Sequence, residues 1–174
     1  MGESLIVRKG GGIKGSWKLM TEIITSNTNW TVPANIKNGE VTVMLFGGGG
    51  SSAYDINSQK GYSIGGGGGG YMRKQTLTLA SGASVPITIG AGGIPNNTNY
   101  KYGVSGGITS FGSYFSASGG EGSKEGNGGN GGSGGGAGYG NGGIGYNFGG
   151  GGSVLGNSGN ANNASIMGGE SKGY

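Results

Sequence analysis

The sequence predicts an all-β protein: a small β-sandwich with glycine-rich layers of the polyglycine II type and long loops. Short runs rich in β-branched residues alternate between apolar and polar positions with a period of two. No window has a convincing helical period. Glycine fills 50 of the 174 positions, in clusters that follow successive strand-like runs. Leu, Ile, Val and Phe together make up only about 17% of the chain, too little for an ordinary core of this length.

The strand-like runs follow one another from residue 19 to residue 117. Residues 19–24 are β-branched enough to favour a strand over a helix, and residues 29–32 form a run that ends at Pro33. After a turn at Asn38-Gly39, further strands are expected at 41–46, 71–79, 85–89 and 108–117, the last as a hairpin around Gly112. Trp30 is expected to anchor the core beside Val43 or Leu45. Pro86 suggests an edge strand, because proline cannot donate to a ladder.

The glycine clusters allow two interpretations. The main clusters are Gly47–Gly50, Gly65–Gly70, residues 90–93, Gly106-Gly107, Gly119-Gly120 and the tract 126–152. They could be flexible linkers. They could also be polyglycine II helices, which have three residues per turn and direct their backbone N–H and C=O groups at neighbouring helices. The clusters recur after strands, and residues 128–136 keep a three-residue register. We therefore expect ordered glycine helices, which only glycine lets approach so closely.

Composition excludes several kinds of chemistry. The chain has no Cys and no His, and its seven carboxylates are scattered. We therefore expect no catalytic residues, no metal site and no cofactor. The formal net charge is +4, with two Arg and no Arg-Gly-Gly motif, so no nucleic-acid partner is expected. No run of 18 apolar residues and no signal peptide is present, so we expect synthesis in the cytoplasm and no membrane insertion.

An ordered succession of motifs covers roughly residues 28–152. The motifs are Trp30-Thr31-Val32-Pro33, residues 41–46 running into Gly47–Gly50, Gly65–Gly70 followed by Tyr71 and Leu77-Thr78-Leu79, Ile87-Thr88-Ile89-Gly90-Ala91-Gly92-Gly93, and Gly107-Ile108-Thr109-Ser110-Phe111-Gly112 with Ser116-Ala117-Ser118-Gly119-Gly120. This succession resembles the glycine-rich domain of bacteriophage and prophage tail-fibre proteins, which are receptor-binding and adhesin-like. The resemblance implies a component of a virion tail or phage-like particle, made in the host bacterial cytoplasm. In composition alone, the chain is also similar to phage adhesins whose loops between glycine helices bind the host surface.

Two segments rich in Tyr and Asn interrupt the glycine pattern, at 51–64 and 94–105. Tyr beside Asn, Ser and Gly is typical of adaptable binding loops, because rigid aromatic area then lies next to polar contacts. The receptor-binding candidates are Tyr54, Asn57, Tyr62, Asn97, Tyr100 and Tyr102. The alternative is that these are solvated loops whose tyrosines pack over the glycine layers.

Residues 1–20 form a comparatively basic segment, which we interpret as an N-terminal attachment arm. Its candidate residues are Leu5, Ile6, Val7, Arg8, Lys9 and Trp17. The apolar run could add a strand to the sheet edge of another particle protein. The remaining chain divides into a glycine-rich β domain at 21–152 and a Gly/Asn-rich C-terminal segment at 153–174.

The sequence therefore predicts a structural and adhesion component of a phage or phage-like tail, such as a tail-fibre or receptor-binding protein. Its expected partners are other tail or baseplate proteins and a bacterial surface protein or glycan. A homo-oligomer is expected, with a trimer suggested by analogy to fibres. Two alternatives stay open: a baseplate or fibre assembly protein without receptor contact, and a disordered low-complexity interaction protein.

Overall fold

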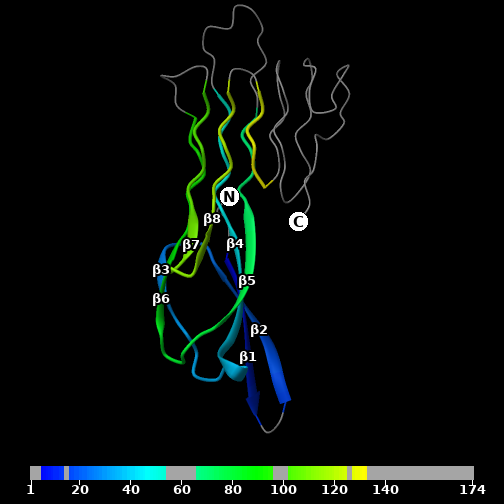
Figure 1. Cartoon of the computed structure of the whole chain (residues 1–174), viewed down its shortest axis with the longest axis vertical. Helices are drawn as coiled ribbons and strands as arrows, with labels where there is room; N and C mark the ends of the chain where they lie inside the picture. Colours follow the sequence, from blue (N-terminus) through cyan, green and yellow to red (C-terminus); the bar gives the residue numbers. More distant parts are fainter. Residues whose placement is uncertain (1–4, 14–15, 54–65, 96–101, 125–126, 133–174) are drawn as a thin grey trace, which may run out of the picture.

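Figure 1 shows the computed structural model of the chain, which describes residues 5–13, 16–53, 66–95, 102–124 and 127–132. The described part is elongated. A hairpin lies at one end, a two-sheet sandwich in the middle, and bundled glycine-rich segments at the other end (Figure 1).

Eight strands and one short 3-10 turn make up the regular structure of the described residues. In order they are β1 (Leu5–Ile13), β2 (Ser16–Ile24), β3 (Thr28–Thr31), η1 (Lys37–Gly39), β4 (Glu40–Phe46), β5 (Met72–Thr78), β6 (Ser84–Thr88), β7 (Thr109–Phe111) and β8 (Phe115–Ala117). Two four-stranded sheets result, with strand orders β2-β1-β4-β5 and β3-β6-β7-β8. Every strand pair is antiparallel. The predicted all-β class is confirmed.

The inward faces of both sheets supply the core. In β4, Val41, Val43 and Leu45 are fully buried and alternate with half-buried neighbours, as the period-two pattern predicts. Trp30 lies in the same core cluster, and its ring contacts that of Phe111 at 5.8 Å between centroids. The Trp30 indole N–H donates to a carboxylate oxygen of Glu22 at 3.1 Å, which satisfies its polar group at the edge of the core.

The expectation that residues 85–89 form an edge strand is wrong, because β6 lies between β3 and β7. Pro86 pairs with Asn29 of β3, and its carbonyl accepts the N–H of Gly112 at 2.7 Å. A residue in a strand directs its N and its C=O to the same side, here the β7 side. The β6–β7 ladder reaches only as far as the pair Ile87–Phe111, so Pro86 lies just outside it. The missing N–H of Pro86 is therefore tolerated, because Pro86 lies beside the β7–β8 turn.

Residues 5–24 form the β1–β2 hairpin, which belongs to the first sheet. The ladder is unbroken from the pair Leu5–Ile24 to the pair Ile13–Ser16. On its other side β1 pairs with β4 through Ile6, Val7 and Arg8. The boundary expected between residues 20 and 21 therefore falls inside β2.

Six glycine-rich segments continue from the sandwich, and we call them together the glycine lattice. Three run away from the sandwich, at 47–53, 90–95 and 118–124, and three run back, at 66–71, 102–108 and 127–132. The first three follow β4, β6 and β8, whereas residues 66–71 and 102–108 lead into β5 and β7. The strands thus pass directly into the lattice (Figure 1).

Hydrogen bonds join the lattice segments with a period of three residues. Segment 47–53 donates in turn to two neighbours, through the pairs Gly47–Tyr71 (3.0 Å) and Gly50–Gly68 (2.7 Å) on one side and Gly48–Gly107 (2.9 Å) and Ser51–Val104 (2.8 Å) on the other. It accepts from a third segment, through Gly120–Gly48 (2.9 Å) and Ser123–Ser51 (3.1 Å). This period is that of the predicted polyglycine II-like layers and not of a flexible linker. Of the tract 128–136, the structure describes residues up to 132.

Glycine is required in the lattice because the backbones approach closely. A Cβ added to Gly67 would overlap the backbone of Gly50, and one added to Gly120 would overlap that of Gly68. Among the described glycines, positive φ angles occur only at Gly39, Gly82 and Gly112, all in turns of the sandwich. Close approach, and not a left-handed conformation, therefore selects glycine in the lattice.

Candidate functional site

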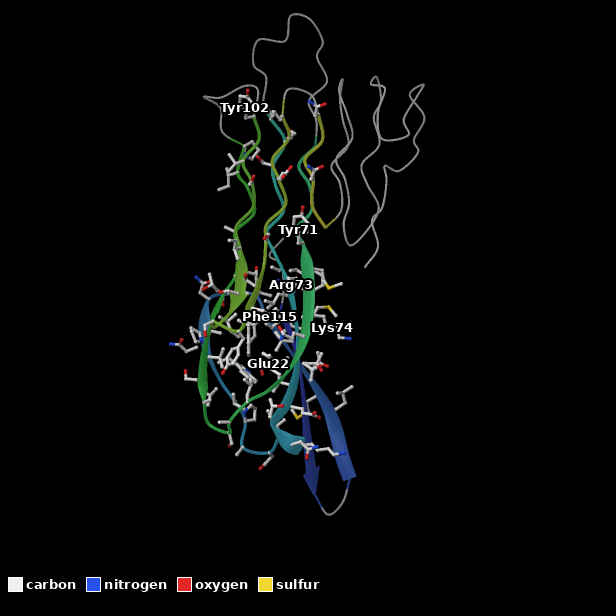
Figure 2. The ribbon with its side chains drawn as sticks, viewed as in Figure 1. Glu22, Tyr71, Arg73, Lys74, Tyr102 and Phe115 are labelled. Carbon is white, nitrogen blue, oxygen red and sulfur yellow. The ribbon has the colours of Figure 1, made fainter. Side chains whose placement is uncertain are left out.

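The candidate site is the end of the lattice remote from the sandwich, which we call the distal end. It comprises residues 51–53, 66, 93–95, 102–104 and 121–127 in their described parts. Because outgoing and returning segments alternate, residues far apart in sequence meet there. Figure 2 labels Tyr102 at this end and Tyr71 near the sandwich.

Two buried serines hold the distal end together. The Ser51 hydroxyl accepts the N–H of Val104 at 2.8 Å, and the Ser123 hydroxyl accepts the N–H of Ala53 at 2.6 Å. Gly103 donates to the Ser123 carbonyl at 2.7 Å. In the described part of the chain, no buried side-chain N or O atom lacks a hydrogen-bond partner. The serines thus satisfy backbone N–H groups and fix the positions of the exposed residues beside them.

Backbone and side-chain hydrogen bonds join segments 118–124 and 127–132 on one side of the distal end. The backbones of Lys124 and Asn127 exchange two hydrogen bonds, of 3.1 and 2.8 Å, and the Asn127 amide also donates to the Lys124 carbonyl at 2.9 Å. Nearby, a carboxylate oxygen of Glu121 accepts from the side-chain amide of Asn130 at 2.9 Å. Segments 118–124 and 127–132 are therefore joined by side chains as well as by backbone.

The distal end presents an aromatic ring, an ammonium group and two aliphatic side chains. The Lys124 Nζ lies 5.6 Å from the centroid of the Tyr102 ring, and these residues form an isolated β-bridge. Tyr102 is 37% exposed, Val104 39% and Ile94 77%. A cation over a ring is attracted by its quadrupole, which orders both groups. The arrangement suits binding of a ligand that stacks on the ring and presents polar or anionic groups to Lys124.

Of the six predicted receptor-binding residues, the structure describes Tyr102 and places it at the distal end. The other five, Tyr54, Asn57, Tyr62, Asn97 and Tyr100, lie outside the described residues. Their roles stay predictions.

The attachment candidates lie in the β1–β2 hairpin. Leu5, Ile6, Val7, Arg8 and Lys9 belong to β1, and Trp17 belongs to β2, opposite Gly12. Ile6, Val7 and Arg8 are paired on both sides within the chain. These three residues cannot join a partner's sheet while this sheet is intact, whereas the outer edge of β2 has no second partner strand among the described residues. Attachment through residues 1–20 stays a prediction.

Sequence reasoning did not single out Lys124 or Ile94. Lys124 is one lysine near the start of a stretch without charge, and its position over Tyr102 depends on how two lattice segments pair. Ile94 lies within the predicted segment 94–105, but a lone isoleucine before Pro95 gives no local sign of exposure.

The sequence profile of one protein family, described as a glycine-rich domain, matches residues 22–174. The chain belongs to this family. The glycine-rich domain so defined begins within β2 and includes the sandwich strands from β3 onward and the lattice. Searches of the curated proteins and of the solved structures returned no significant match.

Two further findings concern the described residues of this glycine-rich domain. They contain no group of three or more Asp, Glu, His or Cys side chains that could hold a metal ion. None of their helical segments has the length and apolar character needed to cross a membrane.

Proposed function

We propose that this glycine-rich domain is a non-enzymatic adhesion component of a phage or phage-like tail. In this role the sandwich connects to the rest of the particle, and the distal end touches a protein or glycan on the bacterial surface. The succession of motifs at residues 28–152 resembles tail-fibre sequences and supports this assignment. A virion tail location and tail or baseplate partners are part of the same proposal.

The observation that carries the proposal is the division of the molecule between lattice and distal end. Nearly every lattice glycine contacts another backbone, so the lattice offers few side chains for recognition. The chain portions 54–65 and 96–101 are joined to described residues at the distal end, namely Ala53, Gly66, Pro95 and Tyr102. Substitutions there can change what is bound without disturbing the hydrogen bonds that hold the segments together.

One observation favours the second candidate, a baseplate or fibre assembly protein without receptor contact. The outer strand β2 exposes Leu19 and Ile23, at 66% and 62%. Exposed apolar residues on an edge strand are typical of assembly surfaces. This surface lies on the hairpin side of the molecule, away from the distal end (Figure 1), so both roles can coexist in one protein.

The proposal is tested with the fluorescently labelled full chain and a panel of Gram-negative and Gram-positive bacterial cells. Tyr102→Ala removes an exposed ring at the distal end, whereas the control Tyr114→Ala removes one, 50% exposed, beside the β7–β8 turn. Truncating an aromatic anchor typically costs about 2 kcal/mol, so Tyr102→Ala is expected to weaken cell binding by roughly tenfold or more. The control should bind as the wild type does.

Melting temperatures accompany the binding measurement. Tyr102→Ala should leave the melting temperature nearly unchanged, because the ring lies outside the core. Equal binding by wild type and Tyr102→Ala, or no binding of the wild type to any cell, would contradict receptor contact at this end. Tyr54→Ala/Tyr100→Ala extends the test to the two interrupting segments, with a loss of several hundredfold expected if each ring is an independent anchor.

A further inference from the structure

β2 is a long outer strand of the first sheet. It has nine residues, contains no Pro, and pairs with β1 without a bulge, so its second edge faces outward (Figure 1). Natural edge strands are usually short, bulged or rich in Lys or Pro, because an open edge is a template for another strand. The other outer strands of the two described sheets differ. β3 and β8 have four and three residues, and β5 carries the exposed pair Arg73 and Lys74.

Apolar side chains on β2 are exposed on both faces of the strand. Leu19 and Ile23 lie on one face, and Met20, 46% exposed, lies on the other face with Glu22. Ile24, at the end of the strand, is buried in the core. A strand added beside β2 would cover Leu19, Met20 and Ile23 while extending the same sheet.

The sequence of β2 is self-complementary in charge. When two copies run antiparallel and are centred on Met20, each residue lies opposite the one equally far from Met20 in the other copy. Lys18 of each copy then lies opposite Glu22 of the other, which gives two pairs of opposite charge. In the same register Trp17 lies opposite Ile23. The same comparison on β5, centred on Gln75, gives no charge complementarity, because Arg73 lies opposite Leu77 and Lys74 opposite Thr76.

We infer that the protein forms a homodimer in which the β2 edges of two copies pair antiparallel about Met20. The first sheets of the two copies then join into one continuous eight-stranded sheet. Charge complementarity selects a second copy of this chain, because the interface needs one Lys and one Glu at symmetric positions and β2 supplies both. This interface also covers the exposed apolar residues of β2 and leaves both distal ends open to a ligand.

Sedimentation equilibrium of the full chain tests the inference. The wild type should show a monomer–dimer equilibrium. Lys18→Glu should weaken the dimer by roughly ten- to a hundredfold, because two favourable cross-strand pairs become two repulsive ones. Glu22→Lys should do the same by the opposite reversal. Far-ultraviolet circular dichroism and thermal melts show whether each variant is folded, which matters for Glu22 because it accepts the Trp30 hydrogen bond.

Mixing the two variants supplies the decisive control. A Lys18→Glu chain paired with a Glu22→Lys chain again has opposite charges at both positions, so the mixture should form heterodimers although neither variant forms homodimers. The double variant Lys18→Glu/Glu22→Lys should dimerise as the wild type does. A monomeric wild type, a trimer, or a dimer unaffected by Lys18→Glu would overturn the inference. Capture of β2 by another tail protein while the chain alone stays monomeric would also overturn it.

Discussion

Individual glycines of the lattice differ in how much room surrounds the position of an added Cβ. At Gly67 that position overlaps the backbone of Gly50, and at Gly48 it overlaps the backbone of Ala91. At Gly49 the nearest atom is the Gly68 carbonyl oxygen, 3.8 Å away, an ordinary contact distance. The lattice therefore has crowded and open glycine positions side by side in sequence, and only the crowded ones demand glycine.

Gly67→Ala and Gly49→Ala form a matched pair that tests this distinction. Gly67→Ala should destabilise the protein by about 3 kcal/mol or more, because overpacking against a hydrogen-bonded backbone cannot be relieved by a rotamer change. Gly49→Ala should leave stability unchanged or raise it by about 0.4–1 kcal/mol, since alanine restricts the unfolded chain. Denaturant unfolding followed by circular dichroism measures both. Similar unfolding midpoints for the two variants would show that backbone crowding does not hold the lattice together.

At the scale of the elements, buried hydroxyl groups secure both ends of the lattice segments. Near the sandwich, the Thr109 hydroxyl accepts the N–H of Gly90 at 2.9 Å, and at the distal end the Ser123 hydroxyl accepts that of Ala53. Thr109 and Ser123 are each 1% exposed. These two hydroxyl groups take the place of a backbone acceptor for Gly90, at the start of segment 90–95, and for Ala53, at the end of segment 47–53.

Ser123→Ala should cost about 1–3 kcal/mol of unfolding free energy, because it leaves the buried N–H of Ala53 without an acceptor. Ser105→Ala is the matched control. The Ser105 hydroxyl accepts from Gly122 at 3.3 Å in an exposed position, where water can replace it. Its loss should stay within about 0.5 kcal/mol. The comparison is made by urea unfolding, and equal costs for the two serines would contradict a structural role for burial at the distal end.

The sequence indicated elements well where apolar residues alternate and poorly where glycine replaces them. β4, β6 and the β7–β8 hairpin all follow the period-two pattern. The comparatively basic composition of residues 1–20 predicts a separate arm, whereas the place of β1 in the sheet depends on pairing with β4, which is distant in sequence. The edge assignment of Pro86 failed because position in a strand, and not sheet order, decides whether a missing N–H is tolerated.

For the candidate site, residue type predicted only part of the arrangement. Tyr102 was found from the Tyr/Asn composition of its segment. Lys124 carries no such local signal, because its contact with Tyr102 depends on which lattice segments are neighbours. The three-residue period predicts that glycine helices bond to neighbours, but it does not say which neighbours, since every glycine face is chemically alike.

At the scale of the whole molecule, lattice and sandwich share the same chain segments. Five of the six lattice segments continue a strand, so no hinge-like linker separates the two regions in the described residues. The N–H of Tyr71, which directly precedes β5, donates to the carbonyl of Ser118, which directly follows β8. Bonds of this kind cross between the two sheets where they enter the lattice. We therefore expect the two regions to unfold together.

Native-state hydrogen exchange tests this cooperativity. The N–H groups of Gly48, Gly50 and Gly120 donate to other segments at 2.9, 2.7 and 2.9 Å, so they should be protected well beyond an unfolded glycine peptide. Their opening free energies should match that of Val43 in β4, and all should fall with the same slope in denaturant, because one global event exposes them. If lattice amides opened at a lower free energy and with a smaller slope than Val43, the lattice would be a separate, weaker unit attached to the sandwich. Exchange of these glycines at peptide rates would contradict an ordered lattice altogether.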